Sequence, residues 1–573
     1  MRKTAKKLAS ISLALCMGLP MVACGGGVGG HEGVCEVQAI LAGYGTDWLE
    51  ESVKVFNEMY KQEGYKVEIT LIDTATRLGS EILTPKRNTT DLYFDYTEQI
   101  KTAIDKSRSI LGKDGGALLE DLTDVYEAKA VGVDKKEQGG AIKERINDYD
   151  IQLNRYTGTS KGYDGIYGFP WYGGAVGMYV NKKVLTEKGY NLDSFLTTDG
   201  VIEVSKALAP STADKSHLNA NNFFPVAWTG VSSGYWAYWT QTLLAQYLGE
   251  KEYKDFYNFI PEGGEEQWIQ SGWSVYQDRG IYEVLHVTEQ LLDRDLAAPG
   301  TVSYDMIASQ VRLMDGKALF MVSGDWIYKE MERDYEEYLD DVIPIKSPII
   351  SSLGVKLGLC GTTHPEPAYP DNQADFVEEY SCAQCEAKLR SVIKAVDAQN
   401  KADAQIATEL GVTEEQVSIV RERRGYYEDA GGFSVVMPSY SDQKEVGKLF
   451  LRFLCSDDAI AIYRKEARAN LKVKPINALD LDTLSETEQI MYEKMYGKDA
   501  HAIYSKTDNL VRIINGVNLY PGGGTTRGTF LNMSYSHSGT SKPMSTAKSI
   551  YFDSVKIVKG NWKDWLKNAN YIV

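Results

Sequence analysis

Residues 165–185 constrain the fold of this chain more than any other stretch, because they read as two short strands joined by a sharply turning connector. Residues 166–169 are apolar and aromatic, as in a buried strand, and Pro170 should end that strand because it has no N–H to donate. A glycine pair then gives the backbone freedom to turn, and residues 176–180 resume an extended apolar run. Asn181 is suited to cap a following helix. The pattern predicts a passage of the chain from one lobe to another.

The chain length and the order of the first elements predict an α/β protein with more than one lobe. A chain of 573 residues is too long for one compact core. We expect strands at 37–42, 67–72 and 91–96, with helices between them at 48–63 and 76–83. Alternating strands and helices build a parallel sheet, and ligands of such sheets bind at the carboxyl ends of the strands.

A second informative motif is a short apolar strand that leads into a glycine and an aromatic ring. Residues 316–326 form an apolar strand that runs into Ser-Gly-Asp-Trp, and a helix is expected from Ile327. Gly324 allows the tight turn that would bring Trp326 over a groove. A tryptophan that begins a helix is also a common packing residue, so burial in the core is the alternative.

The candidate ligand-binding residues fall into two groups. The first group follows the first and third strands of the predicted sheet: Tyr44, Thr46, Asp95 and Tyr96. The second group is aromatic, with one acid, and comes from the connector and from later loops: Trp171, Tyr172, Trp228, Trp236, Asp325 and Trp326. Aromatic faces cover the apolar C–H faces of a sugar, and carboxylates accept hydrogen bonds from its hydroxyls. Core packing is the alternative for each ring.

Charge and aromatic content narrow the class of ligand. The formal net charge is −17, from 62 basic and 79 acidic residues, and no basic stripe stands out. A strongly acidic chain is a poor nucleic-acid binder, so we expect no nucleic-acid partner. The 37 tyrosines and 10 tryptophans are abundant enough to provide flat surfaces with polar edges.

The N-terminus predicts export. A positively charged start precedes an apolar run at residues 8–22, which is too short to span a bilayer. Residues 21–24, Met-Val-Ala-Cys, resemble a bacterial lipobox, so we expect a signal peptide at 1–23 and lipidation of Cys24. An ordinary secretory signal is the alternative. The glycine-rich residues that follow favour a flexible tether at 24–36, holding the protein at the outer face of the cytoplasmic membrane.

Three motifs, taken in order, resemble the extracellular solute-binding proteins of bacterial ABC importers, in particular the sugar-binding group. Residues 167–185 are similar to the first interlobe crossover of that family, and residues 316–326 to its Gly-Lys-x-Ala-Met-x-x-x-Gly-x-Trp signature, whose tryptophan stacks on the ligand. Residues 431–438 resemble the second crossover, and 441–464 a helix pair that follows it. The resemblance implies a two-lobed periplasmic-binding-protein-like α/β fold of type II.

The resemblance also implies a division of the chain. We expect lobe 1 to comprise 37–172 and 432–505, and lobe 2 to comprise 173–364 and 506–573. Residues 365–431 are rich in Ala, Glu, Gln and Lys and predict an extra insertion of surface helices. The large size and this insertion are departures from the family pattern.

The cysteines leave one question open. Besides Cys16 and Cys24, the chain has five cysteines, at 35, 360, 382, 385 and 455. Four residues faintly resemble a zinc set with irregular spacing: Cys360, His364, Cys382 and Cys385. A Cys382–Cys385 disulfide or free thiols are simpler alternatives, and we expect no metal and no cofactor.

The function that these observations favour is capture of a carbohydrate, chiefly an oligosaccharide, and its delivery to the permease subunits of an ABC transporter by a monomer that touches the membrane only through its lipid. One alternative is a cell-surface glycoside hydrolase with Asp95 and Asp325 as its carboxylate pair. Another is a glycan-binding or scaffold lipoprotein without a transport role. The chain has no His-Glu-x-x-His and no phosphate loop, and we do not expect an enzyme.

Overall fold

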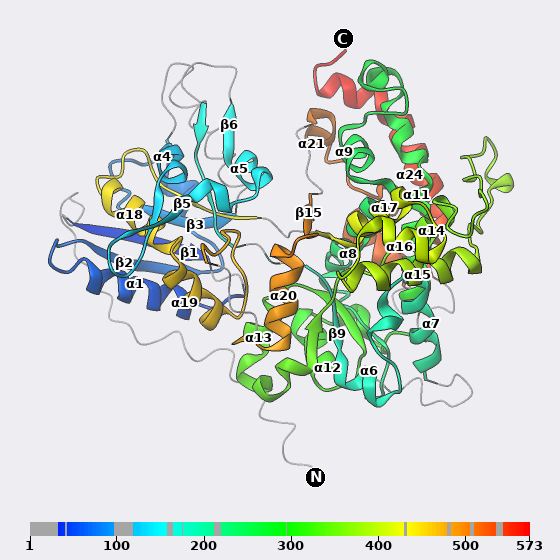
Figure 1. The fold of residues 1–573 in the computed structure, drawn as a ribbon. Coiled ribbons are helices and arrows are strands. Elements are labelled where there is room, and N and C mark those ends of the chain that lie inside the picture. The colour runs from blue at the N-terminus through cyan, green and yellow to red at the C-terminus, as the bar shows by residue number, and fades with distance from the viewer. Residues whose placement is uncertain are drawn as a thin grey trace.

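The protein has two lobes, each built on its own sheet, and they lie side by side with α13 (Ile327–Tyr335) and α20 (Glu486–Tyr496) between them (Figure 1). The computed structural model describes residues 33–40, 43–96, 118–157, 164–172, 174, 176–210, 219, 221–293, 295–428, 432–477, 483–504, 509–534 and 543–572. The predicted signal peptide and Cys24 therefore lie outside the described residues. The first strand begins at Val34, within the stretch that we expected to be a tether.

Lobe 1 contains a five-stranded sheet in the order β2-β1-β3-β14-β8. Its strands are β1 (Val34–Ile40), β2 (Lys66–Asp73), β3 (Leu92–Tyr96), β8 (Phe169–Pro170) and β14 (Phe433–Val436). β1 runs parallel to β2 and β3, whereas β14 lies antiparallel between β3 and β8. Pro170 is the last residue of β8, an edge strand, where a missing N–H is tolerated.

Helices cover this sheet and bury Tyr93, Phe94 and Phe169 within it. They are α1 (Asp47–Met59), α2 (Leu78–Glu81), α4 (Thr123–Glu127), α5 (Asp148–Asn154), α18 (Lys444–Leu454) and α19 (Asp457–Ala467). Two small hairpins add β4 (Lys129–Val131), β5 (Glu137–Ala141), β6 (Arg155–Thr157) and β7 (Asp164–Ile166). Phe56 of α1 meets Phe450 of α18 edge to face at 5.2 Å, which joins the N-terminal part of the lobe to the returning helix pair.

Lobe 2 contains a four-stranded sheet in the order β10-β11-β9-β12. Its strands are β9 (Gly177–Asn181), β10 (Val226–Ala227), β11 (Phe320–Ser323) and β12 (Val342–Pro344). β10 and β11 are parallel, and β9 runs antiparallel to β11 and β12. Asn181 ends β9 and accepts a hydrogen bond from the N–H of Val184, which confirms the predicted helix cap.

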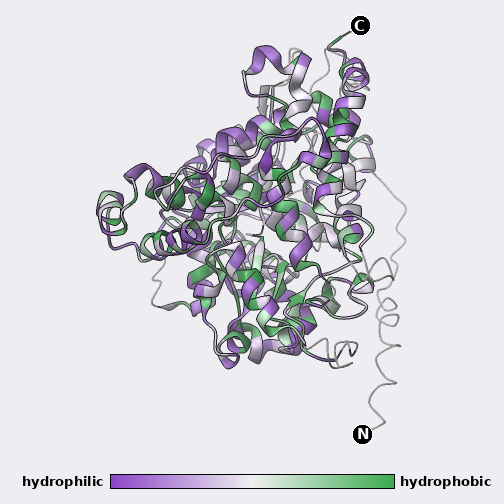
Figure 2. Cartoon of the chain, turned by 90° about the vertical axis from the view of Figure 1, so that its right-hand side faces the viewer, coloured by the Kyte–Doolittle hydropathy of each residue, from purple (hydrophilic) through white to green (hydrophobic). Residues whose placement is uncertain are grey.

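Many helices surround this second sheet: α6 (Lys182–Glu187), α7 (Thr198–Leu208), α8 (Trp236–Leu248), α9 (Glu250–Asn258), α10 (Trp268–Ser271), α11 (Arg279–Leu291), α12 (Met306–Met314), α13 (Ile327–Tyr335), α14 (Ser352–Lys356), α21 (Leu510–Asn515), α22 (Thr526–Met533) and α24 (Ala547–Asn568). Figure 2 looks onto this lobe and shows hydrophilic and hydrophobic residues alternating along its helices, as one-sided burial requires. α8 is the exception: α9, α11, α14 and α17 (Glu414–Arg424) pack against it, so most of its residues are buried.

The chain passes between the lobes at β8–β9, as predicted, and again between β13 (Tyr426–Glu428) and β14. A later passage separates α19 from α20 (Glu486–Tyr496), which packs against β12 of lobe 2. β15 (His501–Ile503) then pairs in parallel with β13. Our sequence-based division assigned residues 432–505 to lobe 1, but these contacts lead us to end lobe 1 at 477.

The insertion is part of the core of lobe 2 rather than a surface decoration. It forms α15 (Ala383–Asp397), α16 (Asp403–Leu410) and α17 (Glu414–Arg424), the last opened by a capping box at Thr413. Leu389, Ile406 and Val420 are fully buried in the same apolar cluster as the residues of α8 and α11. The apolar faces of these helices are therefore covered by the lobe, as an amphipathic helix requires.

Within the described ranges, no helix has both the length and the apolar character needed to cross a bilayer.

Candidate functional site

The two lobes meet at a buried contact between the loop after β1 and the residues before α13. The hydroxyl of Tyr44 donates to Oδ1 of Asp325 across the lobes, with 2.9 Å between the oxygens. Gly174, in the connector, lies against both residues: a Cβ there would sit 2.5 Å from Asp325 Oδ1 and 2.9 Å from the Trp326 ring. Only glycine fits without displacing them, which explains one of the two connector glycines. Gly173 lies outside the described residues.

Asp325 is 1% exposed and strongly influences its surroundings. Burial raises the pKa of Tyr44, Tyr179 and Tyr463 well above the usual value, and the Asp325 charge raises each further. From α20, Lys494 enters the same region and donates from Nζ to the carbonyl of Val176 at 3.1 Å. Burial lowers the pKa of Lys494 to about 8, against the attraction of Asp325. An acid and a base from separate elements thus share this buried contact.

Ion pairs at the edge of α13 add further contacts between the lobes. Lys329 Nζ lies 2.8 Å from a carboxylate oxygen of Asp47, at the start of α1. Arg468, just after α19, lies 2.7 Å from Glu332. Partly exposed ion pairs of this kind contribute about 0–1 kcal/mol each. Their main effect is therefore to orient α13 against lobe 1, and they add little to the stability of the contact between the lobes.

A continuous chain of aromatic rings runs from one lobe to the other. We call it the aromatic arc, and its members, in order of contact, are Tyr96, Phe433, Tyr172, Tyr44, Trp326, Tyr235 and Tyr238. Successive ring centroids are 4.7, 4.7, 4.9, 6.2, 5.9 and 5.3 Å apart. The first four rings belong to lobe 1 and the last three to lobe 2.

Burial differs sharply along the arc. Its middle is inaccessible, with Tyr44 at 2% and Trp326 at 8% exposure, whereas Tyr96 at one end is 45% exposed. Phe433, Tyr235 and Tyr238 are half-buried. The arc therefore offers accessible rings on both lobes, connected through a buried centre.

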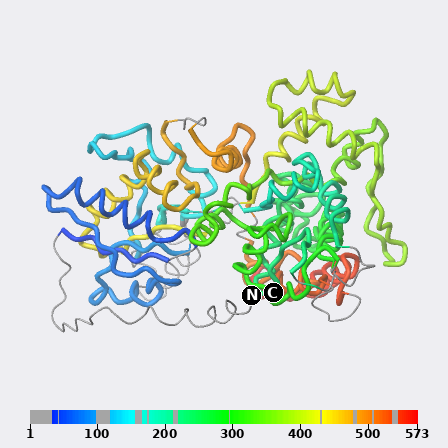
Figure 3. Tube along the Cα trace, turned by 90° about the horizontal axis from the view of Figure 1, so that it is seen from below, coloured from blue at the N-terminus to red at the C-terminus, as the bar shows by residue number. Residues whose placement is uncertain are grey.

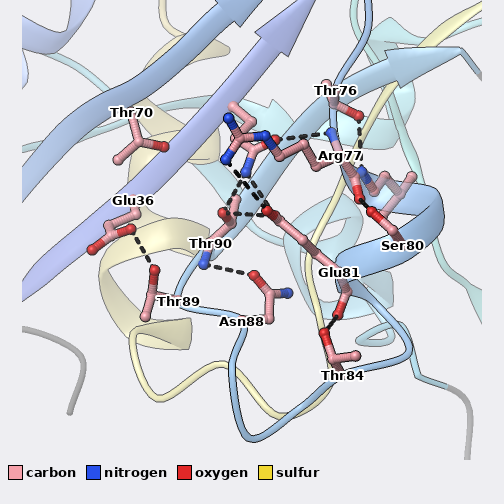
Figure 4. A network of polar contacts seen from close by, with 12 residues as sticks. Glu36, Thr70, Thr76, Arg77, Ser80, Glu81, Thr84, Asn88, Thr89 and Thr90 are labelled. Atoms are coloured by element: carbon pink, nitrogen blue, oxygen red, sulfur yellow. Dashed lines mark hydrogen bonds and ion pairs between the residues drawn. The ribbon is translucent and has the colours of Figure 1, made fainter. Parts of the chain in front are cut away.

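Asp95 lies beside the exposed end of the arc and is held by a polar network. Its Oδ2 accepts a hydrogen bond from Thr76 Oγ1, and burial raises its pKa. The loop that carries Thr76 is fixed by Gln38 of β1, which donates to Glu81 Oε2 at 2.7 Å and accepts from the N–H of Arg77 at 3.0 Å. Figure 4 shows this network around Thr76, Arg77 and Glu81. Thr76 and Asp95 are thus preorganised at the rim of the sheet.

The structure brings together six of the residues that the sequence nominated for ligand binding: Tyr44, Asp95, Tyr96, Tyr172, Asp325 and Trp326. Thr46 is half-buried next to Asp47, at the start of α1. The remaining three are interior residues of their lobes. Trp171 stacks on Trp48 at 5.6 Å in lobe 1, and Trp236 meets Trp239 at 5.6 Å in lobe 2. Trp228 is 3% exposed and belongs to the core of lobe 2.

Sequence reasoning did not nominate Phe433, Tyr235, Tyr238 or Lys494. Phe433 follows the glycine pair of the second crossover, just as Tyr172 precedes the glycines of the first, so the symmetry of the two crossovers was an available signal. Tyr235 and Tyr238 alternate with Trp236 and Trp239 around the start of α8, and no local pattern shows which of these four aromatic residues face the other lobe. No local pattern marks Lys494, because its partners come from distant elements.

A separate cluster of metal-binding residue types lies in lobe 2. The Cys–His cluster, as we name it, consists of Cys360, His364, Cys382 and Cys385, whose ligand atoms all lie within 4.8 Å of one another. It joins α14 to the start of α15 and has no member in the aromatic arc. The cysteines within the described residues are free thiols.

Comparison with known proteins agrees with the fold. Residues 51–367, more than half of the chain, match the family of bacterial extracellular solute-binding proteins. A search of curated protein sequences returned no match.

Solved structures of low sequence identity share the architecture. A probable secreted solute-binding lipoprotein from Streptomyces coelicolor is 11% identical, with a TM-score of 0.51 over 92% of this chain and 98% of that one. An ABC transporter solute-binding protein from Thermotoga lettingae, bound with α-D-tagatose, is 13% identical, with a TM-score of 0.51 over 93% and 99%. A chitin oligosaccharide binding protein is 12% identical, with a TM-score of 0.50 over 92% and 99%. Together with the family match and the two-lobed fold, these likenesses lead to one conclusion: the chain belongs to the bacterial extracellular solute-binding protein family.

Proposed function

We propose that this solute-binding protein captures a carbohydrate, chiefly an oligosaccharide, between its lobes and delivers it to the permease of an ABC transporter. The observation that carries the proposal is the aromatic arc, because it places accessible rings on both lobes around one seam. Aromatic faces pack against the C–H faces of sugar rings. The hydroxyls of the arc's tyrosines and the carboxylate of Asp95 can form hydrogen bonds with the sugar hydroxyls. An arc of seven rings offers more surface than one sugar ring covers, which favours an oligosaccharide.

Ligand entry requires the lobes to separate, because Tyr44 and Asp325 already touch. A hinge motion about the crossovers would break this contact and expose Trp326, Asp325 and the inner face of Tyr172. The ligand would then replace contacts between the lobes with contacts to itself. Its affinity would be reduced by the free energy needed to open the unliganded protein.

The sugars named for two of the similar structures support a carbohydrate as the ligand class. Sequence identity to those proteins is low, so the argument for this chain depends on its own residues. Membership of the solute-binding protein family supports the proposed delivery to a permease.

The direct test is a binding screen with neutral sugars. The purified protein would be mixed with maltose, xylose, cellobiose and chito-oligosaccharide series, and calorimetry, thermal shift and tryptophan fluorescence would be recorded. We expect saturable binding by one series and recovery of the sugar unchanged by chromatography. Conversion of the sugar to shorter products would overturn the proposal in favour of a hydrolase. Binding of no sugar in the panel would favour a scaffold function.

A lipid at Cys24 would hold the protein at the outer face of the cytoplasmic membrane. A metabolically incorporated alkyne fatty acid should label the wild type and not Cys24→Ala, and the variant should move from the membrane fraction into the medium. Equal labelling of both would exclude this anchor. Light scattering of the lipid-free protein should give the mass of a monomer.

A further inference from the structure

The Cys–His cluster lies where the chain leaves α14 and enters the insertion. Cys360 follows α14, and Cys382 is the N-cap of α15, where its sulfur accepts a hydrogen bond from the N–H of Cys385 at 3.4 Å. Between them, residues 361–381 form an extended loop that contains one short 3₁₀ turn, Gln373–Asp375. The cluster therefore brings the two ends of this loop together, on the side of lobe 2 away from lobe 1 (Figures 1 and 3).

The geometry of the cluster is close to that of a tetrahedral metal site. Zinc–sulfur bonds of about 2.3 Å and zinc–nitrogen bonds of about 2.0–2.1 Å put tetrahedral ligand atoms roughly 3.5–3.8 Å apart. Here Cys360 Sγ lies 3.3 Å from His364 Nε2, and no pair in the cluster is more than 4.8 Å apart. Small side-chain adjustments would suffice to centre an ion. The spacings Cys-x3-His and Cys-x2-Cys fall within the range of structural zinc sites.

We propose that the Cys–His cluster binds one zinc ion as a structural site that fixes the insertion to lobe 2. Three thiolates and one imidazole form the ligand set that selects zinc over the harder divalent cations. Four protein ligands fill a tetrahedral shell and leave no open position for substrate, so the site has a structural rather than a catalytic role. This departs from our expectation, based on the sequence, of no metal.

A Cys382–Cys385 disulfide explains the arrangement of the four residues less well than a zinc ion does. A Cys382–Cys385 bond would use two sulfurs and give no reason for Cys360 and His364 to converge on the same point. The sequence offered only the Cys-x-x-Cys pair and a loose second pair. The fold adds that all four residues meet, although residues 365–381 separate the two pairs along the chain.

A metal would complete an attachment that other contacts begin. Arg279 of α11, which is 2% exposed, donates from Nη2 to the carbonyl of Glu378 at 2.7 Å. Tyr247 of α8 donates to Glu366 at 2.6 Å. These contacts hold the middle of the loop, whereas the metal would hold both ends and the first turn of α15. Loss of the metal should therefore loosen the loop and weaken the packing of α15 on α14.

Metal content gives the first test. The protein would be purified without chelator, dialysed, and analysed by plasma mass spectrometry, with one zinc per chain expected. Cys382→Ser should retain less than a tenth of that zinc. Cys455→Ala is the matched control, because Cys455 is a buried thiol outside the cluster, and it should retain one zinc. Wild-type protein without zinc and with a Cys382–Cys385 disulfide in its peptide map would overturn the proposal, as would equal zinc in wild type and Cys382→Ser.

The wild type alone provides a second test that does not depend on the folding of a variant. Cobalt exchanged into the site should give the visible bands of tetrahedral Co²⁺ and a thiolate charge-transfer band. Zinc removal by a strong chelator should lower the melting temperature and open residues 361–381 to limited proteolysis, and added zinc should restore both. An octahedral cobalt spectrum, or a chelator without effect on melting and proteolysis, would contradict a structural zinc.

Discussion

The buried centre and the exposed ends of the aromatic arc contain similar residues in different surroundings. At the centre, Tyr44, Asp325 and Trp326 are almost fully buried and contact one another across the lobes. At one end, Tyr96 is largely open to solvent beside Asp95. The centre therefore holds the lobes together, whereas Tyr96 stays accessible to solvent while the lobes are in contact. Tyr44 and Tyr96 are both tyrosines near an aspartate, but one is buried and holds the lobes together, whereas the other is exposed. Burial, and not residue type, separates their roles.

The largest effect should come from Trp326→Ala. The ring belongs to the core of lobe 1 although it enters from lobe 2, so its loss should cost about 3–5 kcal/mol of unfolding free energy and abolish sugar binding. Trp236→Ala is the matched control inside lobe 2, where a similar loss of stability should leave binding by the folded protein intact. If both variants lose binding equally, Trp326 has no role in binding beyond that of an ordinary core residue.

The next effect concerns the charge buried at the centre of the arc. Burial lowers the pKa of Lys494 from its usual 10.5 to about 8, so between these pH values the unfolded chain binds more protons than the folded one. The contribution of Lys494 to stability is therefore least favourable below pH 8 and improves as pH rises toward 10.5. Across that window the wild type should gain about 3 kcal/mol relative to Lys494→Met.

Urea unfolding of both proteins between pH 7 and pH 10 measures this difference. Lys498→Met provides the control, because Lys498 is exposed beyond the end of α20. Its difference from wild type should not change with pH. A pH-independent difference for Lys494→Met would mean that Lys494 is solvated and that the centre of the arc opens readily.

Tyr44→Phe tests the hydrogen bond between the lobes. Removal of a buried donor to a carboxylate should cost about 1.5–3 kcal/mol and shift the unliganded protein toward an open form, seen as a larger radius of gyration in small-angle scattering. Tyr328→Phe also removes a buried phenol hydrogen bond, to the carbonyl of Val342, but within lobe 2. It should lower stability without the change in shape. If both variants keep the wild-type radius, the Tyr44 contact does not control opening.

Tyr96→Ala should have the smallest effect and the most specific one. One exposed stacking ring is worth about 0.5–1.5 kcal/mol, so we expect sugar affinity to fall up to about tenfold while the melting temperature stays within a degree or two. Tyr571→Ala removes a ring of similar exposure near the C-terminus and should leave affinity unchanged. If Tyr96→Ala binds sugar as the wild type does, the ligand does not contact this end of the arc.

Much of the backbone was predictable from local pattern. The strands at β1, β2 and β3, the helix α1 and the cap at Asn181 follow from apolar periodicity and capping chemistry, which act over a few residues. The near-complete burial of helix α8 has no local cause, because neighbours from four other helices cover most of it. The insertion was recognised as helical, but its membership in the core of lobe 2 depends on partners far away in sequence.

The two-lobed plan can be inferred from the sequence, because the proline and glycines at the crossovers and the alternation of strands and helices are properties of the local chain. Which aromatic residues line the seam and which fill the lobes depends instead on tertiary packing. Trp171 and Tyr172 are neighbours in the connector, yet Trp171 points into the core and Tyr172 joins the arc. The same holds for the Cys–His cluster, whose members meet only because α14 and α15 pack together. Burial and convergence depend on contacts between distant segments, and no local pattern records them.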